Sequence, residues 1–114
     1  MTALQESTWV QVCHHDALPG ERGVAVLLPN SDQAAVFRTH SGDLYALANV
    51  DPFCRAAVLA RGIVGDRSGV PVIVSPMYKH AFDLRTGRSL DDPGVVLRTY
   101  QVQVRDGVIA VRLP

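Results

Sequence analysis

The chain has little cysteine, a single lysine and no excess of charge of either sign. Its 114 residues include only two cysteines, too few for a disulfide scaffold or a four-thiolate metal site. Eleven basic residues balance eleven acidic ones, so no broad positive field would attract nucleic acid or an anionic membrane. No apolar run approaches the ~18 residues of a membrane span. The first residues also lack the basic and apolar segments of a signal peptide. We therefore expect a reduced, soluble, cytoplasmic protein.

The apolar content is sufficient for one folded domain. Hydrophobic residues make up 47% of the chain and charged residues 19%, a balance typical of globular domains and not of disordered chains. A length of 114 residues fits a single domain. We expect that domain to span residues 1–114, with its core at about 9–113. All basic residues except Lys79 are arginines, whose planar guanidinium groups suit docked contacts.

Short β-strands separated by turns dominate the pattern. Asp106-Gly107 is a favoured two-residue hairpin turn between two apolar runs. Helix is expected only as a turn or two near Ala17-Leu18 and within residues 56–60. Alternating or β-branched runs predict strands at residues 9–13, 24–28, 35–38, 44–47, 71–74, 80–84, 102–105 and 108–113. The sequence thus predicts an all-β fold, a small sandwich or barrel of short antiparallel strands.

Two proline-containing loops interrupt these strands. Residues 51–53 read Asp-Pro-Phe, and residues 75–78 read Ser-Pro-Met-Tyr. Proline fixes its own φ angle and biases the preceding residue toward an extended conformation. Because each loop follows a predicted strand, we expect two rigid loops at one end of the sheet domain.

The two loops resemble the cluster-binding loops of Rieske iron–sulfur domains. In that family one loop carries Cys-x-His and the other Cys-x-x-His; the cysteines hold one iron and the histidines the other. The matching positions here are Asp51, Phe53, Ser75 and Tyr78. None of these side chains is a suitable replacement for a thiolate or an imidazole on such an iron. The resemblance implies a Rieske-like scaffold whose ligands are lost and which holds no metal of its own.

Further segments resemble the small subunits of assimilatory NAD(P)H nitrite reductases. The resemblance implies a cytoplasmic large subunit as partner, which binds FAD, siroheme, a 4Fe–4S cluster and NAD(P)H and reduces nitrite to ammonium. It implies that this chain has no catalytic residue and no cofactor, and that it docks on and supports that subunit, without contact to nucleic acid or membrane. The matching segments are residues 9–13, 18–20, 23–28, 35–38, 44–53, 61–66, 75–79 and 82–87.

Side chains on or beside the two loops are the candidate partner-binding residues. The apolar ones either fill the space that a cluster would occupy or project outward as docking anchors. The basic ones, together with Arg67, form either a solvated rim or a surface complementary to an acidic partner. The candidates are Phe53, Arg55, Arg61, Met77, Tyr78, Lys79 and His80.

Other functions compete with this interpretation. A cluster-bearing ferredoxin would need two cysteines and two histidines on the loops, whereas a stand-alone interaction or regulatory module for another oxidoreductase could use the same scaffold. A mononuclear metal site would use Cys13, His14 and His15, but neighbouring strand residues point to opposite faces. We expect a buried Cys13 and two surface histidines. Ser75 and Cys54 have no base beside them in the sequence, which disfavours a nucleophile.

Overall fold

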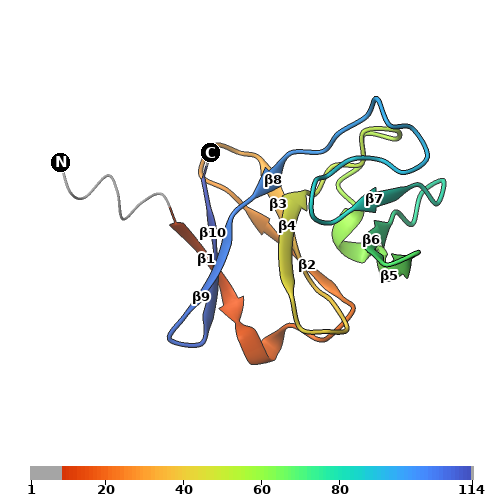
Figure 1. Cartoon of the computed structure of the whole chain (residues 1–114). Coiled ribbons are helices and arrows are strands. Elements are labelled where there is room, and N and C mark those ends of the chain that lie inside the picture. Colours follow the sequence, from red (N-terminus) through yellow and green to blue (C-terminus); the bar gives the residue numbers. More distant parts are fainter. Residues whose placement is uncertain (1–8, 114) are drawn as a thin grey trace.

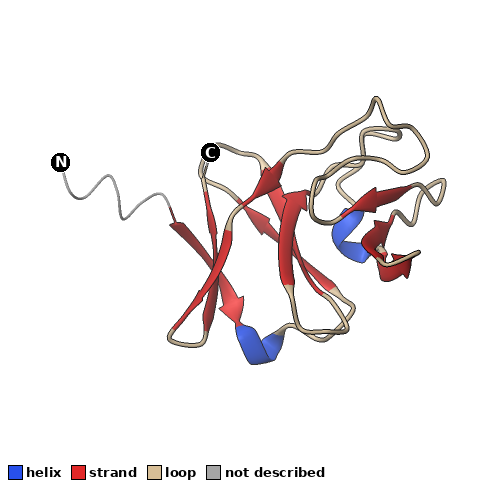
Figure 2. Cartoon of the chain, in the orientation of Figure 1, coloured by secondary structure: helices blue, strands red, loops and turns tan. Residues whose placement is uncertain are grey.

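The computed structural model describes residues 9–113 and contains ten strands and two short 3-10 helices (Figure 1). Figure 2 shows these two short helices in blue, and no α-helix occurs in residues 9–113. Neither short helix is long or apolar enough to cross a membrane. The elements are β1 (Trp9–His14), η1 (His15–Ala17), β2 (Gly23–Leu27), β3 (Gln33–Arg38), β4 (Leu44–Ala48), η2 (Leu59–Arg61), β5 (Ile63–Arg67), β6 (Val70–Val74), β7 (Ala81–Asp83), β8 (Thr99–Tyr100), β9 (Val102–Arg105) and β10 (Val108–Arg112).

The strands form three antiparallel sheets. The strand orders are β1-β10-β9, β2-β3-β4-β8 and β5-β6-β7. Figure 1 shows the four-stranded sheet between the other two, with β1, β9 and β10 on one side and β5, β6 and β7 on the other. The all-β, Rieske-like fold expected from the sequence is confirmed.

Strand β3 divides the apolar interior into two clusters because successive side chains of a strand point to opposite faces. Ala35 and Phe37 belong to the cluster between the middle sheet and β5-β6-β7, which includes Leu47, Leu59, Val64, Ile73, Phe82, Leu84 and Leu97. Ala34 and Val36 belong to the second cluster, which includes Leu18, Leu28, Ala46, Ile109 and Val111. The middle sheet is therefore packed on both faces, which fixes its register.

The sequence locates most strands to within one or two residues, but it misses β5 and β8. Strand β5 reads Ile-Val-Gly-Asp-Arg, where the glycine and the charged residues break the apolar pattern. Both expected helical turns occur as single 3-10 turns, shifted by a few residues to His15–Ala17 and Leu59–Arg61. Gly62 follows the second turn, and a Cβ atom there would lie 2.3 Å from the carbonyl oxygen of Val74. This close approach sets residues 61–63 beside the end of β6.

Candidate functional site

The two proline-containing loops are joined at their centres. The first loop, residues 49–58, follows β4, and the second loop, residues 75–80, follows β6. Asp51 and Ser75 are both 0% exposed, and the Ser75 hydroxyl donates a hydrogen bond to the Asp51 carboxylate. The other carboxylate oxygen accepts the Phe53 N–H at 2.8 Å, and Ser75 Oγ accepts the Met77 N–H at 3.2 Å. The polar groups of Asp51 and Ser75 thus organise both loops at once.

An aromatic stack joins the loops beside this hydrogen bond. The Phe53 and His80 rings lie 3.9 Å apart between centroids, with an interplanar angle of 11°. Phe82 lies behind Phe53 at 6.1 Å, and Tyr78 meets the edge of His80 at 6.4 Å. The His80 Nδ1 atom is buried and has no hydrogen-bond partner. Phe53 and His80 therefore face each other between the loops. We call the Asp51–Ser75 bond and the Phe53–His80 stack together the clasp.

The remaining candidate side chains point outward. Tyr78 is 68% exposed and Met77 41%, and Arg55, Arg61 and Lys79 are also exposed. Arg67, the last residue of β5, is already paired, because its guanidinium lies 3.5 Å from the Asp91 carboxylate. The structure thus divides the predicted residues into an inward-facing pair and an outward-facing group.

Asn49 secures the base of the first loop and is a residue that the sequence interpretation missed. Its side chain is buried, its oxygen accepts the Ala60 N–H at 2.8 Å, and its amide nitrogen donates to Gln33 at 3.0 Å. The backbone carbonyl of Asn49 also accepts the Leu59 N–H. The only available signal was an amide residue two positions before the Asp-Pro pair, which is too general to assign.

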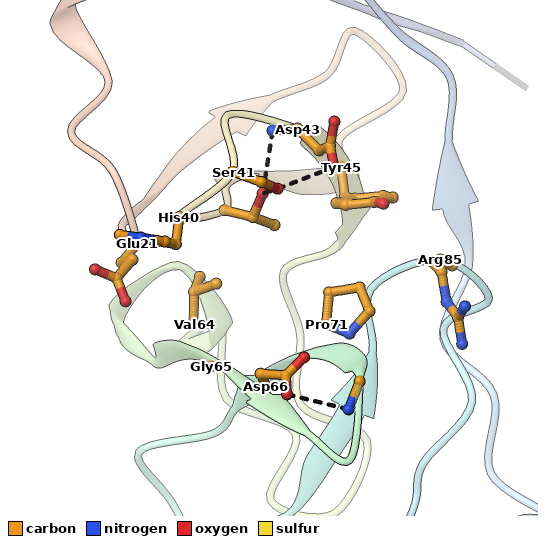
Figure 3. Close-up of a pocket in the computed structure, with 12 residues that line it drawn as sticks. Glu21, His40, Ser41, Asp43, Tyr45, Val64, Gly65, Asp66, Pro71 and Arg85 are labelled. Carbon is orange, nitrogen blue, oxygen red and sulfur yellow. Dashed lines mark hydrogen bonds between the residues drawn. The ribbon is translucent and has the colours of Figure 1, made fainter.

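A hollow of about 580 Å³ lies away from the loops, between the β3–β4 turn and the β5–β6 hairpin (Figure 3). Its rim carries three carboxylates, those of Glu21, Asp43 and Asp66. Arg85 also lines it, but its guanidinium pairs with Asp83 at 3.2 Å. Burial opposes ionisation of Asp83, yet the hydrogen bonds from Arg85 outweigh it and lower the pKa of that carboxyl. No predicted site residue lines this acidic hollow.

The structure does not bring together the residues of the mononuclear metal site or expose the Ser75 nucleophile. Cys13 is half-buried against the second apolar cluster, whereas His14 is exposed. Two of the three proposed metal ligands therefore point in different directions. Within residues 9–113 no three His, Cys, Asp or Glu side chains gather as a metal site would require. Ser75 does have a carboxylate beside it, Asp51, which the sequence did not show. Because both are fully buried, no substrate reaches that hydroxyl.

Comparison with known proteins places this arrangement in a family. A family model described as a Rieske-like [2Fe-2S] domain matches residues 8–112. The small subunit of nitrite reductase (NADH) from Escherichia coli K12 is 36% identical over 107 residues, covering 93% of this chain and 98% of that protein. The chain belongs to the Rieske-like nitrite reductase small-subunit family.

Two further relatives extend the comparison. A crystal structure of a Mycobacterium tuberculosis protein, assigned as an NADH-dependent nitrite reductase small subunit, matches with TM-score 0.87 and 47% identity over 90% of this chain and 92% of that one. A Klebsiella oxytoca protein named nitrite reductase [NAD(P)H] large subunit is 38% identical over 109 residues, covering 96% of this chain and 11% of that protein. In that relative, a domain similar to this small-subunit chain is part of a much longer polypeptide.

The loops of this Rieske-like chain do not fit the cluster for which the family is named. Asp51 and Ser75, which the sequence resemblance matches to the two cysteines, are bonded to each other. Phe53, which it matches to one histidine, is stacked on His80. Tyr78, which it matches to the other histidine, is turned outward to solvent. The positions offer neither the two thiolates nor the two imidazoles that a Rieske cluster uses.

Proposed function

We propose that this chain is the non-catalytic small subunit of a cytoplasmic NAD(P)H nitrite reductase that serves nitrate assimilation. It binds and supports a large subunit that carries FAD, siroheme, a 4Fe–4S cluster and the NAD(P)H site. The observation that best supports this proposal is the near-full-length similarity to a nitrite reductase small subunit, at 36% identity over 93% of this chain.

The choice of partner has separate support. In the Klebsiella oxytoca relative, a domain 38% identical to this chain lies within a polypeptide named as the large subunit. Two modules that share one polypeptide are held at a high effective concentration, which suits a pair that works together. A large subunit on a separate chain is therefore the partner that we infer here.

The clasp supports a role without electron transfer. The two loops close on each other through Asp51, Ser75, Phe53 and His80, so their geometry does not depend on iron. Since the chain supplies none of the four usual ligands at those positions, we propose that it binds no cluster. Its contribution to turnover is then structural, through the complex.

Affinity purification of the tagged chain from its native host, grown on nitrate or nitrite, tests this function. We expect a large protein to co-elute with flavin and siroheme absorption bands, and the chain released from it by salt to be colourless and free of iron. A colourless chain that elutes alone, from cells that contain the reductase, would contradict the proposal and favour a stand-alone module. A brown chain that elutes alone would show that the loops hold a cluster after all.

A further inference from the structure

The two loops expose apolar side chains that a folded domain has no need to expose. Tyr78 is 68% exposed and Met77 41% on the second loop. Ile63, 68% exposed at the start of β5, pairs with Val74 directly before that loop. Val50, 40% exposed on the first loop, lines a separate hollow with Asp32 and Arg98. Single exposed apolar residues are ordinary, but a group at one end of the domain marks an interaction surface.

The charges on this surface are all positive. Arg55 and Lys79 are the exposed charged residues of the two loops, and Arg61 follows the first loop. The one carboxylate in either loop, Asp51, is fully buried in the clasp. Asp91 is exposed beside the end of the second loop, but its carboxylate already accepts the Ala81 N–H at 2.8 Å and pairs with Arg67. The surface is therefore an apolar centre bordered by cations, and the carboxylate beside it is already paired.

The second loop also holds a backbone conformation that its sequence disfavours. Tyr78 and Lys79 both have φ near 60°. Within residues 9–113 two other pairs have consecutive positive φ angles, Ser68-Gly69 and Asp106-Gly107, and each includes a glycine. A non-glycine residue in this region costs about 1–2 kcal/mol, and such strain persists at functional sites. The strained residues are Tyr78, whose side chain is exposed, and its neighbour Lys79.

The clasp positions this exposed group. The Met77 N–H is bonded to Ser75 Oγ, which is in turn bonded to Asp51. The Ser75 N–H donates to the His80 carbonyl oxygen and closes the second loop. The first loop closes in the same way, because the Arg55 N–H donates to the Asp51 carbonyl oxygen at 2.7 Å. Little conformational freedom is left to lose on binding, and such preorganisation raises affinity.

We propose that this surface, formed by Met77, Tyr78, Arg55, Lys79 and Arg61, is the face that docks on the large subunit. Its counterpart there is an apolar recess with carboxylates at its rim, which receives the Tyr78 ring and pairs with the surrounding cations. A second copy of this chain is disfavoured as occupant, since a two-fold contact would bring the same cations together. This docking face rests on the proposed function, because it assumes the large subunit as partner.

Titration of the full chain into the purified holo large subunit of the same host, followed by calorimetry and stopped-flow association, tests the face. Tyr78→Ala should weaken binding about tenfold or more, with its melting temperature within about 2 °C of wild type because the side chain is exposed. Lys79→Glu should slow association several-fold at low salt and flatten its salt dependence. The matched controls are Val104→Ala and Arg105→Glu on β9, an exposed apolar–basic pair in another sheet. Both should bind within about twofold of wild type.

The outcomes separate the docking face from the proposed function. Wild-type binding that Tyr78→Ala and Lys79→Glu leave unchanged would overturn the face and leave the function standing. Equal losses in the loop variants and in the β9 controls would also overturn it. Failure of the wild-type chain itself to bind the large subunit would contradict both.

Discussion

Carboxylates are buried at the end of the domain that carries the two loops, which we call the loop end, and exposed around the acidic hollow. At the loop end the carboxylate of Asp51 is buried and bonded only to neutral donors, and the exposed groups are apolar or cationic. Around the hollow the carboxylates of Glu21, Asp43 and Asp66 are exposed. The end that the sequence resemblance matches to the cluster-binding loops is thus closed by side-chain contacts, while an open hollow lies elsewhere.

This difference shows why a cavity alone is a poor guide to function in this fold. Loss of the ligands would leave a void or a set of unpaired polar groups, both of which destabilise a protein. Here Asp51 and Ser75 bond to each other and Phe53 stacks on His80, while Tyr78 projects into solvent. The functional interpretation therefore depends on the convex surface that the closed loops present.

Removing the clasp carboxylate gives the largest expected contrast between the two regions. Asp51→Ala should lower the free energy of unfolding by about 2–4 kcal/mol, because it leaves the Ser75 hydroxyl and the Phe53 N–H buried without an acceptor. Asp43→Ala at the hollow should cost about 0.5 kcal/mol or less, since that residue is exposed. Urea unfolding followed by circular dichroism measures both. Equal losses in the two variants would show that the clasp contributes no special stability.

The two histidines at these regions provide a second contrast. His80→Ala should cost about 1–2 kcal/mol because it removes the partner of the Phe53 ring, whereas His40→Ala, at the rim of the hollow, should change stability by about 0.5 kcal/mol or less. His80→Phe should retain wild-type stability or exceed it, since Nδ1 is buried without a partner. The same unfolding measurement applies. A His80→Phe variant as unstable as His80→Ala would mean that the imidazole makes a polar contact that the stack does not explain.

The sequence predicted both loops and eight of the ten strands in the described residues because their signals are local. Alternation, β-branching and X-Pro pairs act within a few residues, so they are readable without the fold. The clasp is not local: Asp51 and Ser75 are 24 residues apart and follow strands in different sheets. His80 was expected at the docking surface, but it lies against Phe53 because the second loop folds back through the Ser75–His80 backbone bond. The hollow escaped prediction for the same reason, since its lining comes from residues between Glu21 and Arg85.

Acid titration tests the contribution of the ion pair between Asp83 and Arg85. The folded state lowers the pKa of Asp83, so its stabilising contribution is complete above the usual pKa of about 4 and is lost as the pH falls through the lowered value. Asp83→Asn should therefore cost about 1 kcal/mol at pH 7. The wild-type advantage should diminish below about pH 4, as measured by urea unfolding from pH 3 to 7. A difference between the two proteins that does not change with pH would contradict this assignment.

The smallest expected effect concerns the strained backbone at the docking face. Lys79→Gly and Lys79→Ala both remove the charge, but only glycine accepts φ near 60° without a Cβ penalty. Lys79→Gly should therefore be more stable than Lys79→Ala by up to about 1 kcal/mol, after allowance for the greater freedom of glycine in the unfolded chain. At Arg105, the last residue of strand β9, the same pair of substitutions should favour alanine, because glycine loses more conformational freedom than alanine when a strand forms. If alanine were equally favoured at both positions, the second loop would carry no strain, and the docking face would rest on exposure and charge alone.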